Sequence, residues 1–191
     1  MRIVGGRFRG RNIESPKTDA IRPTTDRARE TLFNVIEHAY GDALADARIL
    51  DLFSGTGALG LEALSRGARF CLFVEEGVEG RGLLRANVEN FGLTGATKIF
   101  RRDATKLGPA APQEPFSLVF ADPPYNRNLG SLALRSARDG GWLQDNALCV
   151  VEEAVGAPFE APRGFECVEE RRIGDTLFRF LRFREGETGQ S

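Results

Sequence analysis

The chain has 191 residues, of which 41% are hydrophobic and 28% are charged, and its formal net charge is −1. This length predicts one domain that buries roughly 70% of the surface of the unfolded chain. A net charge near zero does not by itself indicate a nucleic-acid partner, and no apolar run approaches the ~18 residues that a membrane span requires.

The cysteines predict a reducing compartment. Cys71, Cys149 and Cys167 are widely spaced, form no C-x-x-C pair, and each lies in or beside an apolar run. We therefore predict buried free thiols rather than metal ligands or disulfides. Since the first residues also lack an apolar leader segment, we expect a cytoplasmic protein.

Residues 1–20 are predicted to form a small β-hairpin followed by a linker. Strand-like stretches at residues 2–4 and 8–13 are separated by two glycines. The arginines of this stretch, which no acid accompanies, are Arg2, Arg7, Arg9 and Arg11. A charged edge that prevents aggregation is one interpretation. We favour a phosphate-binding segment that positions RNA, because guanidinium groups bind phosphate oxygens bidentately.

A helix is predicted after the proline-punctuated linker. Either Thr24 or Thr25 can cap it, with Asp26 in its first turn. Its apolar stripe is formed by Ala28, Leu32, Val35, Ile36 and Ala39. Gly41 ends the helix, and the lone histidine, His38, is interpreted as a helix C-terminal residue rather than a catalytic base.

A glycine-rich turn follows a short buried strand. Residues 49–52 form an apolar run whose only charge is Asp51, and Gly55, Gly57 and Gly60 mark the turn. The apolar residues that then recur at helical spacing are Ala58, Leu61 and Leu64. Glycine lets backbone N–H groups approach a ligand closely, and the helix N-terminus favours negative charge. The order strand, glycine turn, helix therefore indicates a cofactor-binding loop.

From this turn onward, strands and helices alternate. Strands are predicted at residues 70–74, 98–101, 116–121 and 147–151, and helices at residues 78–91 and 129–137. This alternation predicts an α/β fold with a doubly wound, mostly parallel sheet. Residues 165–173 and 176–183 predict an antiparallel hairpin that completes a seven-stranded sheet, and residues 185–191 are expected to form a tail.

Acidic residues mark the ends of the predicted strands. They are Asp51, Glu75, Asp103 and Asp122. Ligands of open α/β sheets bind beyond the carboxyl ends of the strands, so we expect these acids to converge on one edge. Glu75 lies twenty residues after Gly55, where a carboxylate can accept hydrogen bonds from ribose hydroxyls. Glu76 follows directly, and the spacing favours Glu75.

The predicted strand at 116–121 ends in Asp122-Pro123-Pro124-Tyr125. This motif suits methylation of an exocyclic amine, which is a poor nucleophile because its lone pair delocalises into the ring. The Asp122 carboxylate and the Pro123 carbonyl can accept hydrogen bonds from the amine. Pro124 stiffens the loop, and Tyr125 offers a ring on which a flipped base can stack. Such chemistry needs no metal and no nucleophilic thiol.

The combined pattern resembles the nucleotide-base amino-methyltransferases that use S-adenosylmethionine (SAM), and more closely the bacterial RsmD family. The stretches that carry the closer resemblance are residues 1–11, Arg-Pro-Thr-Thr-Asp-Arg-Ala-Arg-Glu-Thr-Leu-Phe-Asn at 22–34, the glycine turn, residues 122–125, and Gly-Trp-Leu at 141–143. That family methylates guanine N2 in the 16S RNA of the small ribosomal subunit. The resemblance covers nearly the whole chain.

The resemblance implies a single domain with the Rossmann-like fold of class I SAM-dependent methyltransferases, with its catalytic core over residues 21–184. It implies SAM as cofactor and 16S rRNA, or a small-subunit assembly particle, as partner. The residues implied for the methionine part of SAM are Arg22, Thr25, Asp51, Ser54, Gly55, Thr56 and Gly57. Glu75 would bind the ribose, and Asp103 with Ala104 would contact the adenine. The residues implied to hold guanine are Asp122, Pro123 and Tyr125, and the N-terminal arginines would bind RNA. We expect a monomer, because RNA must reach the open edge of the sheet.

Other functions share parts of this pattern. Asp-Pro-Pro-Tyr also suits adenine N6 methylation of DNA or RNA, and a related Asn-Pro-Pro-Tyr site acts on protein glutamine amides. An NAD-binding oxidoreductase shares the glycine turn and the following acid, yet it leaves residues 122–125 unexplained. A ribosome-assembly module that binds RNA without catalysis is a further alternative.

Overall fold

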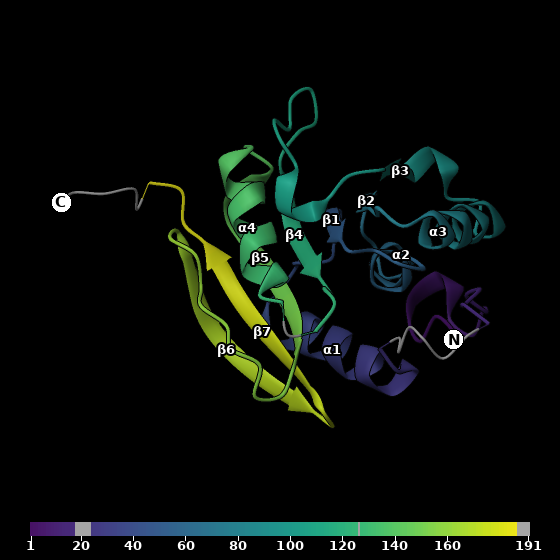
Figure 1. The fold of residues 1–191 in the computed structure, drawn as a ribbon. Coiled ribbons are helices and arrows are strands. Elements are labelled where there is room, and N and C mark those ends of the chain that lie inside the picture. The colour runs from purple at the N-terminus through teal and green to yellow at the C-terminus, as the bar shows by residue number, and fades with distance from the viewer. Residues whose placement is uncertain (18–23, 126, 187–191) are drawn as a thin grey trace.

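The computed structural model describes residues 1–17, 24–125 and 127–186. The described strands form one seven-stranded sheet in the order β3-β2-β1-β4-β5-β7-β6 (Figure 1). The strands are β1 (Arg48–Leu52), β2 (Phe70–Val74), β3 (Thr97–Phe100), β4 (Phe116–Ala121), β5 (Leu143–Ala154), β6 (Phe165–Ile173) and β7 (Thr176–Phe183). The first five pair in parallel, whereas β7 is antiparallel to both β5 and β6. The predicted mostly parallel sheet with an antiparallel C-terminal hairpin is confirmed.

Helices cover both faces of this sheet (Figure 1). They are α1 (Asp26–Ala39), α2 (Ala58–Ser65), α3 (Val78–Asn90) and α4 (Leu129–Asp139). Phe33 of α1, Leu61 of α2 and Leu84 of α3 belong to one buried core. Leu134 of α4 belongs to a second core on the opposite face, together with Ala104 of the 3-10 helix η3 (Ala104–Lys106). The strand order reverses between β1 and β4, which places the switch point of the sheet there.

Strand β5 extends beyond the predicted residues 147–151 at both ends. It begins at Leu143, which pairs with Phe116 of β4, and ends at Ala154, which pairs with Thr176 of β7. Glu152 and Glu153 therefore lie within a strand, although acids are poor strand formers. Pairing with Phe178 and Leu177 of β7 outweighs this weak local preference.

The N-terminal residues form less β-structure than predicted. Arg2 and Asn12 make an isolated antiparallel bridge, and the start of the predicted second strand is instead a 3-10 helix, η1 (Gly6–Phe8). Ile3 and Ile13 are buried, at 1% and 3% exposed, and anchor the segment in the core. The segment lies beside α2 and α3 (Figure 1). The chain folds back here as expected, and a few backbone hydrogen bonds, such as Ile3 N–H to the Arg11 carbonyl at 3.0 Å, join its arms together with the tertiary contacts.

Helix α1 matches its prediction. Of the two candidate caps, Thr25 is the one used, and its hydroxyl accepts the N–H of Ala28 at 3.1 Å. His38 lies exposed in the last turn, with its Nδ1 atom 2.7 Å from the Asn34 carbonyl oxygen. This position confirms that the histidine belongs to the end of a helix.

The cysteine prediction holds in part. Cys71 and Cys149 are buried free thiols, but the prediction is wrong for Cys167, which is free and exposed. Cys167 lies on the edge strand β6, where the register with β7 shifts between Cys167 and Glu169. Such an irregularity turns a side chain away from its alternating position. Burial raises the pKa of Cys149 to about 12, so this thiol stays protonated.

The Gly-Trp-Leu stretch contributes to the core. Trp142 is fully buried and stacks on Phe116, with 6.2 Å between ring centroids. Its indole Nε1–H donates to the Gly108 carbonyl at 2.8 Å. The stretch thus packs against the first residue of β4 and leads into β5, away from the carboxyl edge of the sheet.

Candidate active site

Acidic side chains of neighbouring strands emerge together at the carboxyl edge of the sheet. In the parallel register, Leu52 of β1 lies beside Ala121 of β4, and Ala121 lies beside Val151 of β5. Asp122 directly follows the end of β4 at Ala121, and Glu152 directly follows Val151 within β5, so the two residues lie at the same level. The edge is therefore acidic next to the switch point, where open α/β sheets bind ligands.

The glycine turn between β1 and α2 is held against β2 by Glu75. The Gly55 N–H donates to Glu75 Oε2 at 2.7 Å, and the Gly77 N–H donates to Oε1 at 2.8 Å. Glu76 is exposed and makes no such contact with the turn among the described residues. The structure thus places Glu75, and not Glu76, at the turn.

The backbone of the turn is shaped for close approach. Gly55 and Gly57 have φ angles of 55° and 83°. A Cβ atom at Gly57 would lie 2.4 Å from Leu84, whereas one at Gly55 would meet nothing within 4 Å. Only glycine is unstrained in this conformation, and the space beside Gly55 is open to a ligand. The turn therefore has room for a ligand at Gly55, as expected of a cofactor-binding loop.

The residues before these glycines are fixed by their own contacts. Phe53 adopts a φ of 57°, which costs a non-glycine residue about 1 kcal/mol or more. The Ser54 hydroxyl donates to the Asp51 carbonyl at 2.6 Å, and the Ser54 N–H donates to Val74 at 3.0 Å. Thr56 contributes its backbone carbonyl to a contact with α3. A strained loop that its surroundings hold in place is typical of a ligand-binding loop.

Asp51 lies beneath this turn and is 1% exposed. Its Oδ2 atom accepts the N–H of Gly60, in the first turn of α2, at 3.1 Å. Burial raises the pKa of Asp51 well above its usual value, the bond from Gly60 opposes this, and the nearby Glu75 adds to it. The Asp51 side chain therefore links β1 to the first turn of α2, across the glycine turn.

Asp103 and Ala104 follow β3, beyond β2 in the sheet. The Asp103 carboxylate accepts the Thr105 N–H at 2.9 Å and the Thr105 hydroxyl at 2.7 Å, and these bonds lower the pKa of Asp103. Ala104 is 4% exposed. A fixed carboxylate beside a small apolar residue suits the adenine end of a nucleoside.

Asp122 is half-buried at the end of β4. Burial raises the pKa of its carboxyl group well above the usual value, and the neighbouring carboxylates Glu152, Asp51 and Glu153 raise it further. Pro123 is buried and Pro124 exposed, while Tyr125 is 41% exposed. A carboxylate with this environment is a strong hydrogen-bond acceptor, and an exposed aromatic ring lies close to it in the chain.

Glu152, Glu153 and Thr24 are the site residues that sequence reasoning missed. Glu152 and Glu153 are each 3% exposed, and burial raises the pKa of both. The rule that acids at strand ends converge applies equally to Glu152, which follows the predicted strand at 147–151. Thr24 gives no such signal, because its partner lies 128 residues away on β5.

The threonine pair before α1 reaches the site through Thr24. The Thr24 hydroxyl donates to Glu152 Oε2 at 2.6 Å. Thr25, predicted to contact SAM, is exposed and caps α1. Arg22 lies outside the described residues, so its predicted role remains a prediction.

The four N-terminal arginines lie in different environments. Arg2 is 63% exposed and pairs with Asp26, with its Nε atom 3.6 Å from Oδ2. Arg11 donates to the Asn90 carbonyl at 2.6 Å and lies over the Phe91 ring. Arg7 lies over the Phe8 ring, and the exposed side chain of Arg9 makes no hydrogen bond, ion pair or ring contact with another described residue. Arg7 and Arg9 are therefore the most available of the four.

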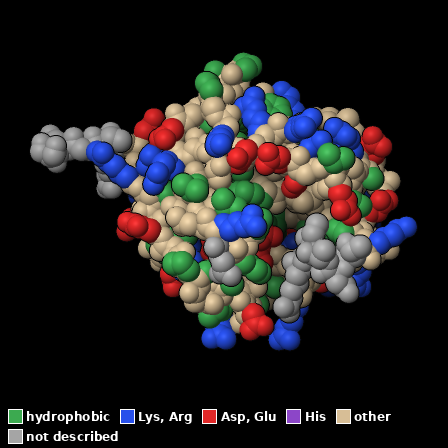
Figure 2. Space-filling view, in the orientation of Figure 1, with side chains coloured by type: hydrophobic (Ala, Val, Ile, Leu, Met, Phe, Trp, Pro, Cys, Tyr) green, Lys and Arg blue, Asp and Glu red, His purple; other side chains and the backbone are tan. Residues whose placement is uncertain are grey.

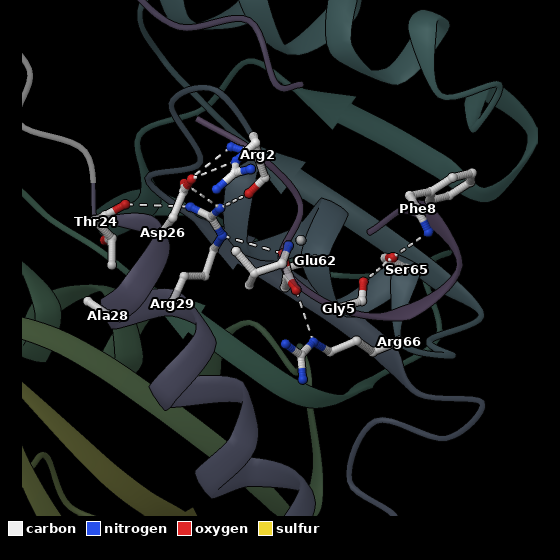
Figure 3. A network of polar contacts seen from close by, with 12 residues as sticks. Arg2, Gly5, Phe8, Thr24, Asp26, Ala28, Arg29, Glu62, Ser65 and Arg66 are labelled. Atoms are coloured by element: carbon white, nitrogen blue, oxygen red, sulfur yellow. Dashed lines mark hydrogen bonds and ion pairs between the residues drawn. The ribbon is translucent and has the colours of Figure 1, made fainter. Parts of the chain in front are cut away.

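A buried ion-pair network holds the N-terminal segment to the core (Figure 3). Arg29 and Glu62 are both 0% exposed, with 3.4 Å between Nε and Oε2. Glu62 also accepts the Val4 N–H at 3.1 Å and Arg66 Nε at 2.9 Å. The Arg29 guanidinium donates in turn to the Arg2 carbonyl and to Asp26. Although partial burial favours a higher pKa, the bonds from Arg2 and Arg29 lower the pKa of Asp26.

A second buried residue links the N-terminal segment to the glycine turn. Asn87 of α3 is 0% exposed. Its Nδ2 atom donates to the Glu14 carbonyl at 3.1 Å and to the Thr56 carbonyl at 3.0 Å, and its Oδ1 atom accepts the Glu14 N–H at 2.7 Å. Every hydrogen-bonding group of this amide is used except one lone pair. Asn87 therefore joins the two segments directly.

Other features of the surface lie away from this edge. A hollow of about 460 Å³ is lined by Arg48, Ser117 and Ala147, at the amino ends of β1, β4 and the central part of β5. It contains none of the predicted site residues. Within the described ranges, no helix is long and apolar enough to cross a membrane. The same ranges hold no group of three or more His, Cys, Asp or Glu side chains that could bind a metal ion.

The strand order, the switch point and the glycine turn together define the Rossmann-like fold of the class I SAM-dependent methyltransferases. An RNA methyltransferase from Salinibacter ruber, solved in complex with S-adenosyl-L-homocysteine, shares this fold. Its TM-score is 0.64 at 15% identity, covering 86% of this chain and 95% of that one. An Escherichia coli protein described as a candidate methyltransferase, yhhF, superimposes with a TM-score of 0.80 at 34% identity, covering 96% and 98% of the two chains.

Sequence comparison gives the family. Residues 1–182 match the family model Cons_hypoth95, described as Conserved hypothetical protein 95. The chain is also 36% identical over 193 residues to Ribosomal RNA small subunit methyltransferase D of Escherichia coli strain K12, covering 98% of this chain and 93% of that protein. The chain belongs to this family, and the resemblance to the RsmD family is confirmed.

Proposed function

We propose that this chain transfers a methyl group from SAM to the exocyclic N2 amine of a guanine in 16S rRNA of the small ribosomal subunit. The observation that carries the proposal is the position of Asp122. This carboxylate stands half-buried at the switch point, between the strand that leads into the glycine turn and the strand that carries Glu152. The relative named for small-subunit ribosomal RNA supports the substrate class.

The carboxyl ends of β1, β2 and β3 form the cofactor half of the proposed site. The open space beside Gly55 leaves room for the methionine part, and Gly57 allows the turn its conformation. Glu75 accepts hydrogen bonds from the ribose hydroxyls, and Asp103 with Ala104 borders the adenine. When bound, SAM supplies a methyl group on a positively charged sulfur, so that an amine gains the methyl as the carbon–sulfur bond breaks and then releases one proton. The acids of this edge favour such a cationic ligand electrostatically.

The carboxyl ends of β4 and β5 form the substrate half. The Asp122 carboxylate accepts hydrogen bonds from the target amine, which keeps the nitrogen oriented and concentrates electron density on it. The Pro123 carbonyl is the second acceptor, and Tyr125 stacks on the base. Guanine presents N1–H and N2–H donors side by side, whereas adenine presents a lone pair at N1. An acidic pocket therefore favours guanine over adenine.

The N-terminal arginines supply phosphate contacts. Because Glu62, Ser65 and Asn87 fix the backbone of this segment on α2 and α3, Arg7 and Arg9 are carried by a rigid element. Figure 2 shows basic and acidic side chains interspersed over one face of the molecule, so RNA attraction comes from local arginines rather than from one large basic field. These contacts position RNA without reading its sequence.

We also propose that residues 1–184 act as one domain; of the tail predicted at residues 185–191, residues 187–191 lie outside the described residues. The N-terminal segment shares the core through Ile3 and Ile13, so it has no separate core of its own. We further propose that the protein acts in the cytoplasm as a monomer. The reaction requires no metal ion, since the sulfonium of SAM already carries the reactive methyl.

The test is transfer of labelled methyl from SAM to small-subunit particles and to naked 16S RNA from cells that lack this protein. Nucleoside analysis then identifies the product. We expect N2-methylguanosine at one position. Detection of a methylated adenine or a methylated protein amide would show that the substrate is not guanine. SAM binding without methyl transfer to either RNA would favour a binding module.

A further inference from the structure

Glu152 lies directly beside Asp122 at the carboxyl edge. The β4–β5 register pairs Phe120 with Val150 and Ala121 with Val151, so Asp122, directly after β4, and Glu152 of β5 stand at the same level. Phe120 and Val150 both belong to the core on the α1 side of the sheet. Because side chains alternate along a strand, Asp122 and Glu152 share that side.

The contacts of Glu152 connect it to the segment before α1. Its Oε2 atom accepts the Thr24 hydroxyl at 2.6 Å, and the Thr24 carbonyl accepts Arg29 Nη1 at 3.5 Å. Thr25, the next residue, caps α1. Glu152 is thus the point at which the threonine pair attaches to the sheet.

No cation offsets this buried acid in the described part of the chain. Glu152 receives one hydrogen bond, from a neutral hydroxyl, although it is 3% exposed. The charged groups that act on its neighbour Asp122 are Asp51 of β1 and Glu152 and Glu153 of β5. Arg179 of β7 acts on Glu153, and Arg29 of α1 reaches only the Thr24 carbonyl on this side. Buried like charges are costly, and such an arrangement is typical of a functional site.

We propose that Glu152 is a positioning residue for the reaction, which holds the threonine pair through Thr24 and keeps Asp122 a strong acceptor for the target amine. This inference rests on the proposed function. A carboxylate beside another carboxylate binds a proton more tightly, and so accepts a stronger hydrogen bond from the amine. When the methylated nitrogen releases its proton, the N–H bond breaks and an O–H bond forms on Asp122, from which the proton passes to solvent.

The two parts of this role are separable by substitution. Glu152→Gln removes the charge but keeps an oxygen that accepts the Thr24 hydroxyl. Thr24→Val removes the hydrogen bond but keeps the charge. Glu152→Asp keeps the charge and shortens the side chain. Glu153→Gln is the comparison variant, because Glu153 is the adjacent acid and the weakest of the influences on Asp122 named above.

The experiment measures the single-turnover rate of methyl transfer from SAM to small-subunit rRNA as a function of pH. In the unmodified protein we expect the rate to fall on the acid side as Asp122 takes up a proton. In Glu152→Gln we expect the rate at the plateau to fall about tenfold. Its acid-side midpoint should move to lower pH by about one unit, because a neighbouring negative charge has been removed.

The other variants check the assignment. Thr24→Val should lower the plateau while leaving the midpoint in place, Glu152→Asp should keep the midpoint near that of the unmodified protein, and Glu153→Gln should shift it less than Glu152→Gln. A midpoint in Glu152→Gln that stays in place or moves to higher pH would overturn the inference. If Glu152→Gln fails to fold, Glu152→Asp becomes the test. A lower acid-side midpoint in Glu152→Asp than in the unmodified protein would then overturn the inference. No transfer by the unmodified protein would instead refute the proposed function.

Discussion

Two groups of buried charge lie near α1, and they are built in opposite ways. Around Glu62, the cations Arg29 and Arg66 and the Val4 N–H surround one carboxylate, so the charge is balanced (Figure 3). Around Asp122, the neighbours are further carboxylates, and among the described residues the Glu152 carboxylate accepts a hydrogen bond only from a neutral hydroxyl. Balanced charge holds the N-terminal segment in place. Negative charge that the described residues leave unbalanced is destabilising by itself, and it is typical of a functional site.

The largest expected effect comes from unbalancing the first group. Arg29→Met leaves Glu62 buried with fewer cationic partners, which should lower the free energy of unfolding by about 3–5 kcal/mol. Urea denaturation measures the change. Arg27→Met is the matched control, because Arg27 lies on the same helix but is exposed, and its effect should stay within about 0.5 kcal/mol. Equal losses for both variants would mean that the buried network is not what holds the segment.

The second prediction removes the central acid of the other group. Asp122→Ala should reduce methyl transfer about a hundredfold or more, because the target amine loses its acceptor. Binding of SAM and of RNA should persist, measured by calorimetry and filter binding. Undiminished transfer would remove Asp122 from the proposed chemistry.

Asn87, like the buried Arg29–Glu62 pair, holds the N-terminal segment in place, but through an uncharged side chain. Asn87→Ala leaves the Glu14 and Thr56 backbone groups without their partner, which should cost about 1–3 kcal/mol of stability and weaken SAM binding. Asn90→Ala is the control, since Asn90 also contacts Glu14 but is exposed. If SAM affinity is the same in both variants, Asn87 does not support the turn.

The melting temperature should depend on pH in a direction that shows the effect of the Asp122 charge. Because the pKa of Asp122 is raised in the folded state, its contribution is complete below the ordinary value of 3.8 and is lost as the pH rises through the raised pKa. Asp122→Asn should therefore melt about 2–4 °C higher than the unmodified protein near neutral pH. The difference should shrink toward pH ~4. Asp42→Asn, at an exposed position, should show no such pH-dependent gain. A lower melting temperature for Asp122→Asn at neutral pH would contradict this reasoning.

The smallest effect separates the N-terminal arginines. Arg9→Ala should weaken RNA binding and reduce the slope of log K against log salt by about 0.7–0.9, because one phosphate contact is lost. Arg2→Ala should change the slope less, since Arg2 is already paired with Asp26. Equal slopes for Arg9→Ala and the unmodified protein would leave Arg9 as a solvated charge.

Local sequence was sufficient for most elements because their signals are local. The apolar runs gave the bounds of β2, β4, β6 and β7, and glycine and threonine marked where α2 and α1 begin. The acids at 51, 75, 103 and 122 pointed to the carboxyl edge, since strand ends can be read from the chain. β5 was underestimated because its extensions depend on pairing with other strands, at Leu143 with β4 and at Glu152 to Ala154 with β7.

Long-range partners were decided only by the tertiary structure. Nothing near Arg29 in the sequence indicates that its guanidinium meets Glu62, and nothing near Thr24 indicates Glu152. Hydrophobic periodicity and turn chemistry act over a few residues, so the sequence by itself determined the elements, their order and the edge at which chemistry is expected. The energy of a buried charge depends on groups that only folding brings together. The fold therefore decided which charges are balanced and which are left for a ligand.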